Sequence, residues 1–235
     1  MVECEDGLRR VADLVLQSSV VGMDLEPYDP KTKRGTFDAL VGKIRLLQLN
    51  LDDDHLFVID VMKVPDLKPL IDAFNTKKPI VIAHNAKMEQ KWMLHHYGLE
   101  IWPVFCTFRA SVLIHNGKQG MGHNLWDLYL RELRIDPPTH DYGDSAWGTP
   151  VLTEGQLAYA ADDVRHLLKL RESLRKRLQQ DGLLTVARIE FESILPECSI
   201  ELNGFHLDRE KWLALAQENV LKAREAESKA LDALP

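Results

Sequence analysis

The sequence predicts an α/β protein in which a mixed β-sheet is flanked by helices. Two observations support this class. The strand-like runs 44–50 and 55–61 are joined by a short turn, which favours antiparallel pairing, and later strands alternate with helical segments, which favours parallel pairing. Residues 183–235 are predicted to form a short helical appendage behind this α/β unit.

The N-terminal half is predicted to supply the antiparallel part of the sheet. In chain order it contains a helix with apolar spacing (5–17), a buried strand (19–26), a loop rich in Pro, Gly and Lys (27–42) and two strand runs (44–50 and 55–61). An acidic turn, Asp52-Asp53-Asp54, joins the last two runs, so we expect a β-hairpin there.

The second half is predicted to alternate strands with helices. It contains a helix (65–75), an apolar strand (79–85), a helix (86–97), a short strand (104–107), helices (107–114 and 124–133), an ordered loop (135–152), a long helix (154–180) and two further helices (185–198 and 208–233). Thr153 and Gln156 have the spacing of a capping box, which sets the start of the long helix.

Composition and length are typical of a globular protein with one large domain and an appendage. Of its 235 residues, 45% are hydrophobic and 28% are charged. No apolar run approaches the roughly 20 residues that a membrane-spanning helix needs. The N-terminus carries acids where a signal peptide has a basic start. We therefore expect a cytoplasmic protein with no membrane partner, and an organelle matrix is the alternative.

The net charge of −7 disfavours a protein that grips duplex nucleic acid by neutralising many phosphates. It leaves open a protein that binds a short strand through a local site and bound metal ions. Carboxylates gathered to hold metals also lower the net charge.

The stretch VVGMDLEPYD places two carboxylates near the end of a predicted strand. Asp24 and Glu26 are two residues apart, so on a strand their side chains share a face. Two like charges at that distance repel each other unless a positive group lies between them. Either both acids are solvated at an exposed edge, or a metal ion holds them.

Two later segments add further candidate groups. Asn85 and Glu89 lie where an apolar strand gives way to a helix, where they would serve either as a helix cap and a first-turn acid or as site residues. Tyr159 and Asp163 are four residues apart on the long helix and share one face. They form either a core tyrosine with a solvated acid or a further part of a site.

Taken in order, these segments resemble the DEDD superfamily of 3′–5′ exonucleases, in the tyrosine-containing branch of RNase D and the proofreading domain of family A DNA polymerases. The resemblance covers about residues 5–180, and the segments IRLLQLN, TFRASVLIH, GHNLWDLYLREL and DSAWG support it. It implies an RNase H-like fold and a metal-dependent hydrolase acting on phosphodiester bonds.

The resemblance also implies a two-metal site with two Mg²⁺ or Mn²⁺ ions. Asp24 would bridge both ions, Glu26 and Asp163 would complete the first site, and Glu89 would serve the second, directly or through water. Tyr159 would orient the attacking water. The family has Asp where this chain has Glu89, and the longer side chain predicts an altered rate or a preference for Mn²⁺.

Candidate nucleic-acid contacts lie around these acids. Asn85 follows the apolar strand, and Lys33 and Arg34 lie in the loop after Glu26, where they would contact phosphates unless they are simply solvated. Five aromatic residues either stack on bases or pack in the core: Phe37, Trp92, Phe108, Trp126 and Trp147. Trp147, which precedes the tyrosine helix, is the best candidate for stacking.

The expected function is a 3′–5′ exonuclease that releases nucleoside 5′-monophosphates. The domain would span residues 1–182, and residues 188–212 resemble the segment that leads into the thumb of family A polymerases. That resemblance implies either a stand-alone exonuclease of that lineage or a piece of a longer polymerase, with a polymerase domain downstream. That likeness favours DNA, as a single strand or a 3′ end, whereas the RNase D-like core favours RNA. The alternatives are a catalytically weak nucleic-acid-binding module, a proofreading fragment of a polymerase, and an unrelated protein with chance acids.

Overall fold

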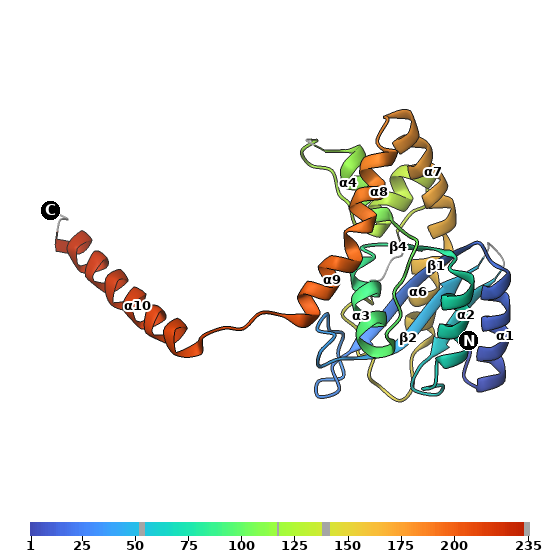
Figure 1. Cartoon of the computed structure of the whole chain (residues 1–235), viewed down its shortest axis with the longest axis horizontal. Coiled ribbons are helices and arrows are strands. Elements are labelled where there is room, and N and C mark those ends of the chain that lie inside the picture. The colour runs from blue at the N-terminus through green and yellow to red at the C-terminus, as the bar shows by residue number, and fades with distance from the viewer. Residues whose placement is uncertain (52–54, 117, 138–141, 233–235) are drawn as a thin grey trace. The chain divides into compact units, whose positions relative to one another are not determined.

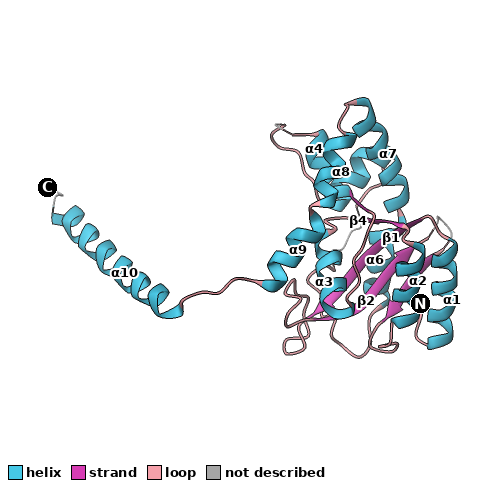
Figure 2. Cartoon of the chain, in the orientation of Figure 1, coloured by secondary structure: helices cyan, strands magenta, loops and turns pink. Residues whose placement is uncertain are grey.

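The computed structural model describes residues 1–51, 55–116, 118–137 and 142–232, and these contain a mixed sheet with the strand order β3-β2-β1-β4-β5 (Figure 2). The strands are β1 (Val20–Tyr28), β2 (Lys43–Asn50), β3 (Leu56–Asp60), β4 (Ile80–Ala83) and β5 (Val104–Cys106). β1, β2 and β3 pair antiparallel, β4 runs parallel to β1, and β5 runs parallel to β4. The predicted hairpin and mixed sheet are confirmed, and the acidic turn at 52–54 lies outside the described residues.

Helices cover both faces of this sheet, with α1 and α2 on one face and α6 on the other (Figure 1). Those of the compact part are α1 (Glu5–Gln17), α2 (Lys68–Lys77), α3 (Lys87–Tyr97), α4 (Thr107–Ile114), α5 (Leu125–Leu128), the π-helix η1 (Tyr129–Leu133), α6 (Glu154–Arg165), α7 (Leu167–Gln180), α8 (Leu184–Glu192) and α9 (Ile194–Asn203). The larger apolar core joins the sheet to α1 and α2, and a smaller one lies under α6.

The predicted helix 154–180 is in fact two helices, α6 and α7. His166 lies between them with φ −113° and ψ 7°, outside the α-helical region, so the prediction of one continuous helix is wrong at this residue. The capping box at the start of α6 is confirmed. The Thr153 hydroxyl accepts a hydrogen bond from the Gln156 N–H, and the Gln156 side chain accepts one from the Thr153 N–H.

One compact unit extends from Met1 to Leu202, further than the domain boundary expected at residue 182. The helices α8 and α9 belong to it because they pack onto its core. The ring centroids of Phe191 and Phe105 are 4.9 Å apart, and the Glu201 carboxylate pairs with Lys87 at 2.6 Å.

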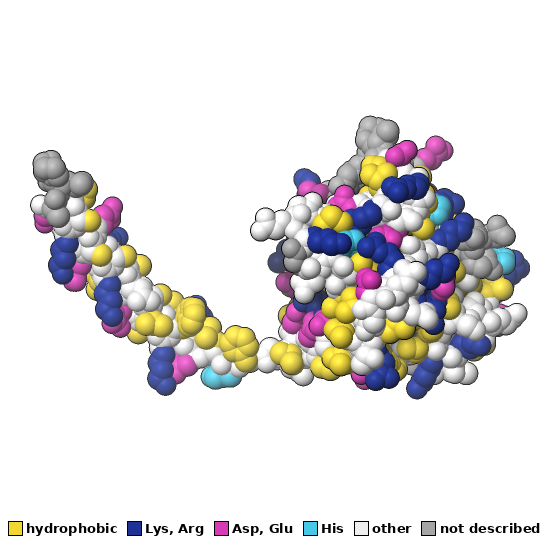
Figure 3. All heavy atoms as spheres, turned by 90° about the horizontal axis from the view of Figure 1, so that it is seen from above, with side chains coloured by type: hydrophobic (Ala, Val, Ile, Leu, Met, Phe, Trp, Pro, Cys, Tyr) yellow, Lys and Arg dark blue, Asp and Glu magenta, His cyan; other side chains and the backbone are white. Residues whose placement is uncertain are grey.

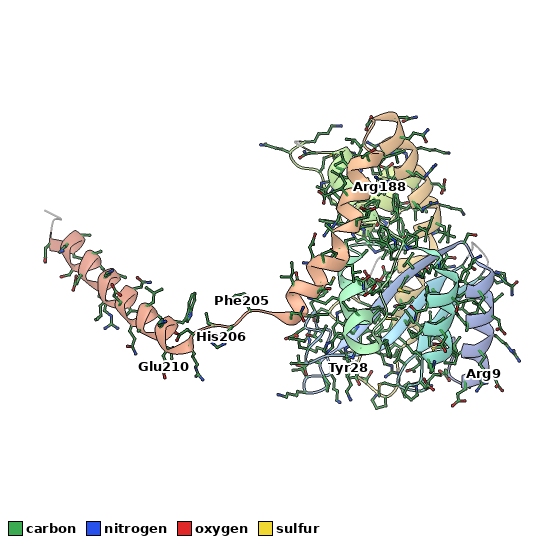
Figure 4. All side chains as sticks on the ribbon, in the orientation of Figure 1. Arg9, Tyr28, Arg188, Phe205, His206 and Glu210 are labelled. Carbon is green, nitrogen blue, oxygen red and sulfur yellow. The ribbon has the colours of Figure 1, made fainter. Side chains whose placement is uncertain are left out.

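The second unit comprises residues 203–235, and its described part contains α10 (Arg209–Asp232), in which no residue is buried. Hydrophobic side chains gather along α10 between charged ones (Figure 3). Phe205, which is 88% exposed, precedes this helix (Figure 4). The likeness of this segment to a polymerase thumb stays a prediction. No helix of the described residues combines the length and the apolar character that crossing a membrane requires.

Candidate active site

The acids of β1 and α6 meet on one face of the sheet. Asp24 lies opposite Gln48 of β2, and Glu26 lies opposite Leu46, so both acids project toward α6. One carboxylate oxygen from each of Asp24, Glu26 and Asp163 lies within 4.8 Å of the other two. The shared face predicted for the first two acids is confirmed, and Asp163 joins them.

The helix α6 brings Tyr159 and Asp163 to the same cavity. They lie one turn apart and therefore project from the same side of the helix. Ala160 is fully buried between them, and its small side chain lets the helix backbone approach the sheet. Asp163 is 7% exposed, whereas Tyr159 is half-buried at the cavity wall.

Glu89 approaches the acids from the first turn of α3. Its side chain is 1% exposed, and neither carboxylate oxygen has a hydrogen-bond donor in the part of the chain that the structure describes. Burial and the negative charge of Asp24 raise the pKa of Glu89 well above its ordinary value. Burial likewise raises the pKa of Asp24 from 3.8 to about 6.

The cluster fits a divalent cation. Three carboxylate oxygens converge within 4.8 Å, and Glu89 adds a buried carboxyl group whose oxygens meet no donor among the described residues. Carboxylate oxygens are the ligands that Mg²⁺ prefers, and a cation would remove the cost of burying these charges close together. This acidic cluster is therefore consistent with divalent metal binding.

A cavity of about 420 Å³ opens over the cluster. The acids Asp24, Glu26 and Asp163 lie along it, and its other walls come from residues 35–37, His84, Met88, Leu125, Gly143, Asp144 and Tyr159. Burial, and to a smaller extent the charge of His123, lowers the pKa of His84 to about 4. The His84 side chain in the cavity wall is therefore neutral at physiological pH. The cavity is large enough to receive one end of an extended ligand.

The predicted phosphate-binding residues lie around the cavity rather than in it. Asn85 is exposed with φ 59°, and it does not line the cavity. The Lys33 ammonium lies 6.0 Å from the centre of the Tyr28 ring. The Arg34 guanidinium pairs with Asp144 of the cavity wall at 2.6 Å, so it links the two loops that form the rim.

Trp147 is a packing residue, which corrects its expected role in base stacking. Its side chain is fully buried and belongs to the small core under α6, with Tyr28, Leu46 and Val58. Because the ring has no face open to the cavity, it cannot stack on a base here. Its loop folds inward because Arg45 of β2 donates hydrogen bonds to the carbonyls of residues 149 and 150.

Gln48, which the sequence analysis did not name, and Phe37, which it named only among the aromatic candidates, also contribute to the site. Gln48 is fully buried on β2, and its amide donates to the Glu26 carboxylate at 3.5 Å. Its place opposite Asp24 follows from the register between β1 and β2, which alternation alone does not fix. Phe37 lines the cavity, and its side chain is 77% exposed. The sequence feature that pointed to Phe37 was an aromatic residue in the long loop that follows the strand with the two acids.

A model of the 3′–5′ exonuclease family matches residues 1–179, and the chain belongs to this family of hydrolases. The predicted resemblance is therefore confirmed. DNA polymerase I of Aquifex aeolicus (strain VF5) is 29% identical over 231 residues, which cover 91% of this chain and 37% of the polymerase. The chain spans less than half the length of each of the curated relatives it matches.

Solved structures share the fold. RNase D of Escherichia coli matches with a TM-score of 0.71 and 21% identity, over 84% of this chain and 50% of that one. The NrnC protein of Brucella melitensis with bound Mg²⁺ matches with a TM-score of 0.69 and 24% identity, over 80% and 88%. The RNase H-like exonuclease fold, with a five-stranded sheet and C-terminal helices, is therefore established for the described residues.

Proposed function

We propose that this chain is a metal-dependent 3′–5′ exonuclease that hydrolyses the terminal phosphodiester bond of a nucleic acid and releases nucleoside 5′-monophosphates. The observation that carries this proposal is the convergence of Asp24, Glu26 and Asp163 within 4.8 Å at a cavity that Tyr159 also lines. Membership of the 3′–5′ exonuclease family supports it.

The proposed mechanism assigns one role to each group. Asp24, Glu26 and Asp163 would hold the first ion, and Asp24 and Glu89 the second. Two bound Mg²⁺ or Mn²⁺ ions would supply charge stabilisation for the attacking and leaving oxygens of an in-line displacement. The Tyr159 hydroxyl would hydrogen-bond the attacking water and orient it toward phosphorus. The Gln48 amide would keep the Glu26 carboxylate turned toward the cavity.

DNA is the substrate that we favour, as a single strand or a 3′ end. The similarity to DNA polymerase I covers 91% of this chain, including much of residues 183–235, whereas the matches to ribonuclease D cover 58–76%. A proofreading role beside a polymerase domain follows from that likeness. RNA is the second candidate, since ribonuclease D is a relative.

The experiment compares 5′-labelled substrates with the chain and its Asp24→Ala variant in Mg²⁺ or Mn²⁺. Single-stranded DNA, 3′-recessed DNA and RNA are the three arms. We expect a ladder that shortens one nucleotide at a time, fastest on DNA, and disappears in the variant. Intact label in every arm would contradict the proposal and favour a nucleic-acid-binding module, in which Glu89 has uncoupled the site.

A further inference from the structure

The carbonyl groups at the end of α6 are held by side chains from other elements. The last four carbonyls of a helix have no partner within that helix. The Asn50 amide donates to the carbonyl oxygens of Val164 and Arg165, at 3.0 and 2.9 Å. The Tyr129 hydroxyl donates to the carbonyl oxygen of Asp163 at 2.9 Å. Three successive carbonyls at the break between α6 and α7 therefore have side-chain donors.

Both donors are themselves fixed. The side chains of Asn50 and Tyr129 are fully buried. Asn50 ends β2 and lies opposite Gly22, so the sheet sets its position. The Tyr129 ring packs edge-on against His166, with ring centroids 5.5 Å apart. A phenolic hydroxyl carries its proton at neutral pH, so Tyr129 acts as a donor here.

Gly22 lets the helix break approach β1. A Cβ atom at this residue would lie 3.3 Å from Asn50 Cβ, Leu167 Cβ and Leu168 Cδ1. The first turn of α7 therefore packs directly on β1, two residues before Asp24. The break in the helix and the strand that carries the acids are in contact.

We propose that Asn50 and Tyr129 are positioning residues that end α6 at His166 and thereby fix the Asp163 carboxylate against those of β1. Helix breaks have identifiable causes, and here side-chain donors replace the backbone hydrogen bonds of a continuous helix. The backbone of Asp163 is one of the groups held, so loss of the donor moves the acid itself. The inference rests on the proposed function of the acidic cluster.

The test uses Tyr129→Phe, which removes one oxygen atom and keeps the ring. Mn²⁺ binding is measured by electron paramagnetic resonance, beside kcat and KM on a labelled oligonucleotide. We expect Mn²⁺ affinity and kcat to fall about tenfold or more, because outer groups that orient metal ligands typically contribute about 10–100-fold. KM should stay within about twofold, since the hydroxyl does not reach the substrate. Asn50→Ala should act in the same direction, and Asn50→Ser, which keeps one donor, should be intermediate.

Leu178→Ala is the matched control, because Leu178 is buried at the far end of α7 from Asp163. It should lower the melting temperature and leave Mn²⁺ affinity unchanged. If Tyr129→Phe and Asn50→Ser lose only melting temperature, as the control does, the positioning role is overturned. If the unmodified chain neither binds Mn²⁺ nor cleaves, the proposed function fails instead. Should Tyr129→Phe not fold, Asn50→Ser decides between these outcomes by the same measurements.

Discussion

The two faces of the β1–β2 pair differ in that one is apolar throughout and the other, beside the small core under α6, carries the acids. Met23, Leu25 and Leu47 face the core shared with α1 and α2, and each is at most 2% exposed. On the same strands, Asp24 and Glu26 alternate with them and face α6. Apolar burial on one face stabilises the fold, whereas burial of carboxylates on the other costs free energy unless a cation neutralises them.

Neighbouring residues of β1 therefore have different roles. Met23 and Leu25 stabilise the fold, whereas Asp24 and Glu26 between and beside them are placed to bind metal. A substitution on the apolar face should weaken folding and leave metal binding intact. Replacement of an acid on the other face, which we call the acidic face, should remove metal binding and activity without weakening the metal-free fold.

The largest effect is expected for Asp24→Asn. Because Asp24 lies within 4.8 Å of both other acids, its loss should lower the rate of nucleotide release by about a thousandfold or more. Its metal-free melting temperature should be equal to or above that of the unmodified chain, because one of the converging negative charges is gone. Asp162→Asn is the control, since Asp162 pairs with Arg165 outside the cluster. Activity of Asp24→Asn within tenfold of the unmodified chain would refute the acidic face as the catalytic one.

Leu47→Ala tests the apolar face and should lower the stability of the fold. Leu47 is fully buried, and such truncations typically cost about 2–5 kcal/mol of unfolding free energy. Urea denaturation measures this loss. The rise in melting temperature on adding Mg²⁺ should stay as large as in the unmodified chain, and a lost Mg²⁺ response would show that the two faces are not separable.

Glu89→Gln keeps the shape of the side chain and removes its charge. We expect activity to fall about 10–100-fold, as for groups that support metal ligands. The metal-free protein should become more stable, because the charge of Asp24 no longer has a buried carboxyl neighbour. Steady-state rates in Mg²⁺ and in Mn²⁺ check this, and full activity in both metals would leave Glu89 with no role in the site.

The acidic face should also respond to pH. The pKa of Asp24 is 3.8 ordinarily and about 6 in the folded chain, so the folded state holds its proton to higher pH. Stability without metal should therefore fall as the pH rises from about 4 to about 6. Mg²⁺ competes with that proton, so the melting-temperature gain from Mg²⁺ should grow over the same window, by about 5 °C. A gain independent of pH, measured by calorimetry, would contradict this.

Phe37→Ala should have the smallest effect. The ring is 77% exposed at the cavity, and stacking on a base contributes about 1–3 kcal/mol. We expect KM for a single strand to rise about tenfold with little change in kcat. Leu40→Ala is the matched control, because Leu40 is exposed on the same loop but does not line the cavity. Equal KM values for the two variants would exclude stacking by Phe37.

Local patterns predicted the acidic face, because strand alternation and helical spacing follow from the backbone alone. The shared face of Asp24 and Glu26 and the capping box at Thr153 needed no distant contact. The helix break at His166 was missed, since the donors that hold it come from β2 and η1. Local patterns left open whether Trp147 stacks on a base or packs in the core, because the hydrogen bonds that hold its loop come from Arg45 on another strand.

The central claim is that the acidic face holds divalent cations. Crystals soaked in Mn²⁺ and measured at a wavelength with anomalous signal test it most directly. The account predicts an anomalous peak among the carboxylates of Asp24, Glu26 and Asp163, and a second one between Asp24 and Glu89. The account would be contradicted if Mn²⁺ bound fully at other places in the crystal and these carboxylates showed no anomalous peak.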